Sequence, residues 1–183
     1  MAGWIVLVVI VLVAFWAIAI FNKLVKNRNL VLEGWSGIDV QLKRRYDLIP
    51  NLVETVKGYA RHEEGTLAKV VELRNAAGKA QTVAEKAPLE TALTGMLRQV
   101  FALAEAYPDL KANQNFLDLQ AQLSEIEEQI QFARRYYNGT ARDMNILVQS
   151  FPSNIIANSF GFKQADYFEI ELTTEREVPE VKF

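Results

Sequence analysis

The sequence contains no cysteine and only one histidine, His62, among its 183 residues. The absence of cysteine excludes disulfides, thiol nucleophiles and thiolate metal sites. One histidine cannot supply the two histidines of a zinc-protease helix or the paired Glu-x-x-His sets of a di-metal helical bundle. The chain also has no nucleophile-elbow serine motif, phosphate-binding glycine loop or dinucleotide-binding fingerprint. We therefore expect no cofactor, no catalytic metal and no enzymatic activity.

A site built from carboxylates alone is the remaining catalytic hypothesis. Its candidate residues are Glu63, Glu64, Glu125, Glu127 and Glu128. Acidic clusters of this kind are usually solvated faces of helices. We therefore favour exposed helix surfaces for both clusters, and a surface or capping position for His62.

An excess of positive charge is also missing, because 20 basic residues stand against 22 acidic ones and give a formal net charge of -2. A general nucleic-acid binder needs a basic surface that displaces the counterions of the phosphates. The balance therefore argues against a nucleic-acid partner. With no recognisable ligand-binding motif, we expect no small-molecule substrate either.

Charged side chains are absent from the first 21 residues. The segment Gly3–Phe21 reads GWIVLVVIVLVAFWAIAIF, and about 20 apolar residues in a helix span the ~30 Å hydrocarbon core of a bilayer. Trp4 lies near one end, where an indole ring favours the membrane interface. Lys23, Lys26 and Arg28 follow the other end directly. This pattern predicts a transmembrane helix that contacts the lipid bilayer through residues 3–21.

Two alternatives to an uncleaved membrane helix are a signal peptide and a buried core helix. The triplet Ala17-Ile18-Ala19 resembles a signal-peptidase site. A signal peptide, however, usually begins with positively charged residues, and no Lys or Arg precedes the apolar run here. A soluble core helix of this length would carry a polar face. We therefore favour a single-pass anchor, and the positive-inside rule then predicts an outside N-terminus and a cytoplasmic body.

The rest of the chain shows the alternating three- and four-residue spacing of helices that pack side by side. The longest such stripe runs from Phe116 to Phe151 through Leu119, Leu123, Ile126, Ile130, Ala133, Tyr137, Thr140, Met144 and Leu147. A shorter helix is expected from Leu89 to Tyr107, since Pro88 precedes it and Pro108 follows it. The predicted connections are Gly78–Ala87 and Tyr107–Ala112, and Ser153 is expected to cap a short helix ending at Phe160.

These patterns predict an all-α fold: an N-terminal transmembrane helix followed by an elongated antiparallel bundle of about three long helices, with an extended C-terminal tail. The expected boundaries are 1–22 for the transmembrane anchor, 23–162 for the helical domain and 163–183 for the acidic tail. No window of the body up to Phe151 shows a sustained two-residue alternation, so no sheet is needed there.

Two residues interrupt the first apolar stripe. Pro50 removes a backbone donor and clashes with the carbonyl of Tyr46, which produces either a helix break near Asp47 or one kinked helix. The stripe continues on both sides, so we favour the kinked helix. Arg45 takes a position where an apolar residue is expected. Its side chain either lies along the bundle with its head in water, or is buried and paired with an acid, for which the candidates are Asp118, Glu125, Glu127 and Glu128.

The long stripe also predicts self-association. A helix over Leu89–Tyr107 is too short to cover all of it, and exposed apolar surface usually marks an interface. The candidate interaction or structural residues are Arg45, Pro50, Trp35, Phe116, Tyr136, Tyr137 and Phe151. The alternative to a homo-oligomer is that the segment from Ser153 to Phe162 folds back over the uncovered end.

Several long motifs of the chain resemble those of the LemA family over nearly its whole length. They read FNKLV from Phe21, QLKRRYDLIPNLVETVKGYARHE from Gln41, AEAYPDLKANQNFLDLQAQL from Ala104, ARRYYNGTARDMN from Ala133 and FPSNIIANSFGFKQADYFE from Phe151. The chain departs from the family pattern at Gly139 and Met144. Gly139 lies inside the long helix, where it would mark a bend or a close helix crossing.

The resemblance implies a single-pass protein of the bacterial cell (inner) membrane with a helical extramembrane domain, and it implies no enzymatic reaction. Some family members are associated with membrane proteolysis genes or with membrane-organelle biogenesis, which suggests a scaffold or adaptor. The function that we expect is a membrane-anchored helical scaffold or interaction protein that self-associates. The alternative is a regulatory partner of a membrane enzyme, such as a membrane protease.

Overall fold

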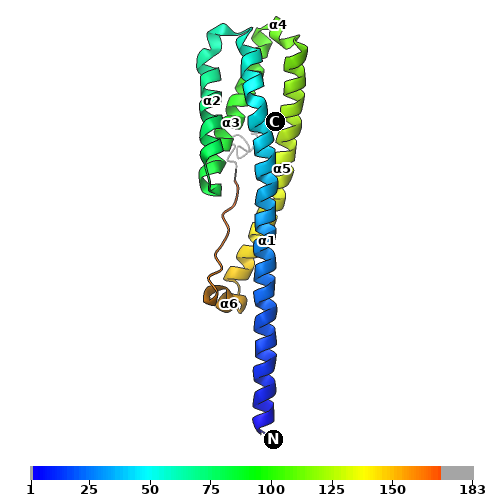
Figure 1. The fold of residues 1–183 in the computed structure, drawn as a ribbon, viewed down its shortest axis with the longest axis vertical. Coiled ribbons are helices and arrows are strands. Elements are labelled where there is room, and N and C mark those ends of the chain that lie inside the picture. Colours follow the sequence, from blue (N-terminus) through cyan, green and yellow to red (C-terminus); the bar gives the residue numbers. More distant parts are fainter. Residues whose placement is uncertain (1, 170–183) are drawn as a thin grey trace, which may run out of the picture. The chain divides into compact units, whose positions relative to one another are not determined.

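The computed structural model describes residues 2–169, and over that range it contains helices and no strand (Figure 1). The all-α prediction is confirmed. The elements in chain order are α1 (Ala2–Lys57), the 3-10 turn η1 (Arg61–Glu63), α2 (Glu64–Lys79), α3 (Val83–Leu103), the 3-10 turn η2 (Ala104–Ala106), α4 (Pro108–Lys111), α5 (Gln114–Gln149) and α6 (Ser153–Ser159).

The chain divides into two compact units. The first combines residues up to Ile38 with Ala133–Tyr167, and the second begins with Asp39–Phe132 and resumes at Phe168. Helices α1 and α5 each contribute to both units. Each unit is described separately below.

The start of α1 exposes its apolar side chains. The large apolar residues from Trp4 to Ile18 are 42% to 75% exposed. Helix α1 is long and apolar enough to cross a membrane by length and composition, and 0% of its most apolar window is buried against the rest of the chain. A protein surface of this kind is stable only where something apolar covers it.

The second unit is a bundle in which α1, α2, α3 and α5 share one core. Figure 1 shows the last part of α1 alongside α2, α3 and the first part of α5. Each helix contributes side chains at three- and four-residue spacing, which places them on one face. Members of this core are Ile49, Leu52 and Val56 of α1, Leu67, Val70 and Leu73 of α2, Leu93, Leu97 and Val100 of α3, and Phe116, Leu119 and Leu123 of α5.

One connection differs from expectation, and one break between helices was not predicted. Helix α1 ends at Lys57, and a turn before η1 leads into α2 as a separate helix. The loop expected at Gly78–Ala87 is much shorter, because α3 begins at Val83 instead of after Pro88. Thr82 starts α3 with a capping box: the Glu85 backbone N–H donates to Thr82 Oγ1 at 3.2 Å, and the Thr82 N–H donates to Glu85 Oε2 at 3.4 Å.

Helix α1 continues through Pro50 as one helix, so the break near Asp47 does not occur. Proline cannot donate a hydrogen bond to the carbonyl four residues earlier, which here belongs to Tyr46. Arg74 of α2 supplies the missing donor, because its Nε lies 3.2 Å from the Tyr46 carbonyl oxygen. A neighbouring helix thus satisfies the acceptor that Pro50 leaves free.

In the first unit, α1 and the second half of α5 approach each other closely at Gly34. A Cβ at Gly34 would lie 3.1 Å from the Tyr137 Cα. The rings of Trp35 and Tyr137 also pack here, with centroids 5.7 Å apart. The expectation that Gly139 marks a close crossing is wrong, because a Cβ there would meet nothing within 4 Å.

The long stripe is covered at Met144, although its last residue, Phe151, is 80% exposed. Met144 is 2% exposed and Val148 is 9% exposed, and both pack with Leu24 of α1 and with Ala157 and Phe162 from the chain's return. The alternative, in which the segment from Ser153 to Phe162 folds back, therefore describes the structure better.

Details of this return differ from expectation. Helix α6 begins at Ser153, but Pro152 holds the N-cap position and the Ser153 hydroxyl donates to the Ser150 carbonyl oxygen at 2.9 Å. Gly161 ends the segment with a φ of 69°, a conformation that glycine adopts without a steric penalty. Residues 163–169 have no regular secondary structure. The rest of the predicted tail lies outside the described residues.

We predict that Pro50 and Arg74 are energetically coupled. Arg74→Met should lower the unfolding free energy by about 1 kcal/mol, because the Tyr46 carbonyl loses its donor. In a Pro50→Ala background the same change should cost less, since the backbone N–H at position 50 then reaches that carbonyl. Pro50→Ala alone should retain helicity. Urea unfolding of the four proteins in detergent, followed by circular dichroism, measures the coupling, and equal costs in both backgrounds would show that Arg74 does not replace the missing donor.

Candidate functional site

The strongest polar cluster of the second unit surrounds Arg45, which is 1% exposed. Its Nη1 atom donates to Thr94 Oγ1 at 2.9 Å and to Glu127 Oε2 at 2.7 Å. Its Nη2 atom contacts Glu90 Oε2, and the Tyr46 hydroxyl contacts Glu90 Oε1. Side chains from α1, α3 and α5 therefore meet at one guanidinium group.

The paired interpretation of Arg45 is confirmed, and Glu127 was one of the four acids expected to reach it. Glu90, which is 0% exposed, was not among them. A sequence signal for Glu90 does exist, because it precedes Leu93 by three residues and Leu97 by seven. These positions share one helical face, and both leucines are buried.

The cluster contains two carboxylates for one guanidinium. Burial lowers the pKa of Arg45, while the charge of Glu127 acts in the opposite direction. Burial, followed by the charges of Glu127 and Asp39, raises the pKa of Glu90 to about 8. At neutral pH the charges therefore balance as one ion pair, Arg45 with Glu127, beside a protonated Glu90.

A second ion pair extends this polar region. Lys86 Nζ lies 2.8 Å from Asp39 Oδ1, and the Lys86 side chain is only 8% exposed. Lys86 thus joins α3 to α1 in the same unit as Arg45 does. The Asp39 side chain is 57% exposed, so this pair constrains the alignment of α1 and α3 less than the buried contacts of Arg45 do.

The Arg45 cluster has the geometry of a structural network. A cavity of about 240 Å³ lies against Arg45, Thr94 and Glu127, and its other lining includes Leu97, Phe101 and Leu123. Over residues 2–169, no group of three His, Cys, Asp or Glu side chains is placed to hold a metal ion. His62 is exposed within η1.

The other candidate residues lie in different surroundings. Phe116 is 1% exposed and packs against Phe101 with ring centroids 6.1 Å apart. Tyr137 is 2% exposed, whereas Tyr136 is 49% exposed and Phe151 is 80% exposed. Phe116 and Tyr137 are thus core residues, and Tyr136 and Phe151 remain available for contacts.

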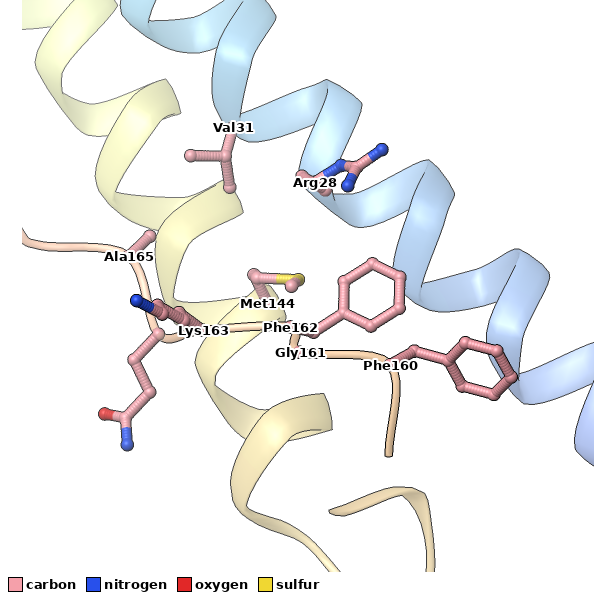
Figure 2. A pocket seen from close by; sticks show the side chains of 9 residues that line it. Arg28, Val31, Met144, Phe160, Gly161, Phe162, Lys163 and Ala165 are labelled. Atoms are coloured by element: carbon pink, nitrogen blue, oxygen red, sulfur yellow. The ribbon is translucent and has the colours of Figure 1, made fainter. Parts of the chain in front are cut away.

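The first unit contains a cavity of about 300 Å³ between α1 and the chain's return (Figure 2). Residues around it include Arg28 and Val31 of α1, Met144 of α5, and Phe160, Phe162 and Lys163. The Arg28 guanidinium lies 5.5 Å from the centroid of the Phe162 ring, within range of a cation–π attraction. The sequence analysis did not anticipate this cavity, because the return of residues 160–165 to α1 has no periodic pattern.

Asn145 and Tyr137 hold the returning segment in place. The Asn145 side chain donates to the Ala165 carbonyl oxygen at 2.9 Å and accepts from the Ala165 N–H at 2.7 Å. The Tyr137 hydroxyl donates to the Asp166 carbonyl oxygen at 2.8 Å. Burial, and then the charge of Asp166, raises the pKa of Tyr137, so this hydroxyl remains a donor at neutral pH. The sequence analysis missed Asn145.

We predict that Glu90 makes stability depend on pH. Its pKa is about 8 in the folded chain and ~4.3 in an unfolded one. Folding therefore retains a proton that the unfolded chain releases, and the unfolding free energy falls as the pH rises through this window. Glu90→Gln removes the titrating group, so the variant should gain stability relative to the native chain between pH 5 and pH 8.

Urea unfolding at several pH values tests this prediction, with Glu54→Gln as the control, because Glu54 is an exposed carboxylate on α1. The stability difference between Glu90→Gln and the native chain should grow with pH, and that for the control should not. A constant difference for Glu90→Gln would mean that Glu90 is ionised in the folded chain at every pH tested.

Comparison with known proteins gives one family. The model of the LemA family matches residues 34–183. Protein LemA of Metamycoplasma hominis is 27% identical over 153 residues, which cover 81% of this chain and 68% of that protein. Magnetosome protein MamQ 2 of Paramagnetospirillum magneticum is 24% identical over 163 residues, which cover 73% of this chain and 59% of that protein.

Magnetosome protein MamQ of Magnetospirillum gryphiswaldense is 20% identical over 162 residues, and the match covers 58% of its length. The chain therefore spans less than two thirds of the MamQ proteins that it matches. The family model covers well over half of the chain, and its match includes both the Arg45 cluster and the α6 segment. The chain belongs to the LemA family.

Proposed function

We propose that the protein is a single-pass, membrane-anchored scaffold or interaction protein that self-associates and has no catalytic activity. The observation that carries this proposal is the exposed apolar start of α1, which continues as one helix into a folded bundle. A helix with this surface satisfies its own backbone groups and needs only lipid around its side chains. The MamQ relatives are named magnetosome proteins, which supports an association with membranes.

The proposed location is the bacterial cell (inner) membrane, with the N-terminus outside and the bundle in the cytoplasm. Lys23, Lys26 and Arg28 support this orientation, because positive residues beside a membrane helix are retained on the cytoplasmic side. They are all exposed and follow the apolar run directly.

Self-association is proposed on a different basis from the long stripe, which the chain covers itself. Exposed apolar side chains of the first unit lie on α1 and α5: Leu32 is 60% exposed, Tyr136 is 49% exposed and Ile146 is 52% exposed. A membrane anchor confines copies to two dimensions and raises their effective concentration. The proposed partner of this surface is therefore another copy of the chain.

The absence of cysteine makes a direct test possible, since any introduced cysteine is unique. Tyr136→Cys and Ile146→Cys place a thiol on the proposed contact surface, and Lys111→Cys on α4 is the control at an exposed site of the second unit. Oxidation in native membranes should give covalent dimers for the first two variants and not for the control. The Lys111→Cys thiol should react with a membrane-impermeant maleimide only after the cells are opened.

Two outcomes would contradict this proposal. A single chain at every position, and in detergent-solubilised samples, would exclude self-association. Stoichiometric recovery of one other membrane protein without dimers would favour the alternative function, a regulatory partner of a membrane enzyme such as a protease. Labelling of Lys111→Cys in intact cells would reverse the proposed orientation.

A further inference from the structure

Three large apolar side chains are exposed within ten residues at α6. Phe151 is 80% exposed, Ile155 is 54% exposed and Phe160 is 64% exposed. The same segment also sends Ala157 and Phe162 into the core of the first unit. The segment is therefore fixed by its buried side and presents an apolar outer side, which we name the α6 patch (Phe151, Ile155 and Phe160).

The α6 patch lies beside the end of the apolar run of α1. The rings of Phe21 and Phe160 have centroids 4.8 Å apart, and those of Phe21 and Phe162 are 5.8 Å apart. Phe21 is the last residue of that run before Lys23. Figure 2 shows Phe160 beside α1 at the edge of the cavity. The apolar surface of the α6 patch is therefore continuous with the surface that the proposed anchor presents to lipid.

The charges around the α6 patch have one sign. Lys23, Lys26, Arg28 and Lys163 are exposed, and neither residues 20–32 nor residues 144–165 contain an Asp or Glu. The Arg28 guanidinium and Lys163 both border the cavity between α1 and the return. Cationic side chains next to an apolar surface are the combination that binds the headgroup layer of an anionic membrane.

We propose that the α6 patch inserts into the interfacial layer of the same bilayer that α1 crosses, with the surrounding Lys and Arg side chains on the lipid phosphates. This inference rests on the proposed membrane anchoring. The cationic surroundings favour lipid over a second copy, since two such patches would bring like charges together. A second point of contact fixes the first unit against rotation about the α1 axis.

Spin labels on single cysteines in the full-length chain test this insertion. The test positions are Phe151→Cys, Ile155→Cys and Phe160→Cys, reconstituted in vesicles of phosphatidylcholine and phosphatidylglycerol. Leu12→Cys, at a site 62% exposed on the apolar run, reports on the lipid core. Glu54→Cys, at an exposed site of α1 outside the proposed self-association surface, reports on water, because 33 residues of helix place it about 50 Å beyond Phe21.

Dissolved oxygen concentrates in lipid, and a soluble nickel complex stays in water. The ratio of the two reagents' relaxation effects at the three test positions should fall between those at Leu12→Cys and Glu54→Cys. A ratio equal to that at Glu54→Cys would overturn the insertion and leave the anchor intact, provided that Leu12→Cys reports lipid. Labels shielded from both reagents would show that a protein surface covers the α6 patch, and this result would also overturn the proposed insertion. A water-exposed Leu12→Cys label would contradict the membrane anchoring itself.

Discussion

The buried charge of Arg45 is the constraint on which the bundle of the second unit depends. A guanidinium group that leaves water must find hydrogen-bond acceptors, because an unpaired buried charge costs several kcal/mol. The acceptors come from two other helices: Glu90 and Thr94 are four residues apart on α3, and Glu127 lies on α5. The alignment of α1, α3 and α5 in the structure brings these groups together. The apolar core supplies most of the attraction between the helices, and Arg45 selects the alignment.

The first unit is held together by a close helix contact and by hydrogen bonds to the returning segment, not by a buried charge. Gly34 lets α1 and α5 approach closely. The Asn145 side-chain amide forms hydrogen bonds with both the backbone N–H and the backbone carbonyl oxygen of Ala165. These contacts bring the return of the chain against α1, where the apolar run ends. Apolar and cationic side chains of the first unit therefore lie together at the end of the apolar run, where we propose that the membrane interface lies. The second unit is a bundle of helices around an apolar core.

The sequence predicted the fold class because its helical periodicity is long and regular. The stripe from Phe116 to Phe151 spans nearly all of α5 (Gln114–Gln149), and the long apolar start of α1 follows from composition alone. The separate helix α2 was not predicted, because the break after Lys57 contains no proline. Gly58, directly after Lys57, is the sequence signal that could have marked this helix end. The start of α3 was misplaced, because Pro88 was given more weight than the capping box at Thr82.

The polar contacts were harder to predict, because they join residues far apart in the chain. Arg45 in an apolar stripe indicated that a buried acid was needed, and Glu127 was among the candidates. Glu90 is hard to predict as a buried residue, because its neighbour Leu89 also fits an apolar helical stripe with Leu93. Asn145 and the return of residues 160–165 have no periodic signal, so only the structure shows that they meet.

The unfolding free energy of Arg45→Met measures the central claim most directly, with Arg44→Met as the control at the exposed neighbouring position. Methionine keeps the apolar length of the side chain and removes its charge. If Arg45 fixes the bundle, Arg45→Met should lose about 3–5 kcal/mol, because it leaves the buried Glu90 carboxyl and the partly buried Glu127 carboxylate without their partner. The triple variant Arg45→Met, Glu90→Leu and Glu127→Gln should then recover most of that loss. An Arg45→Met protein as stable as Arg44→Met would contradict the claim that this buried charge determines how the helices align.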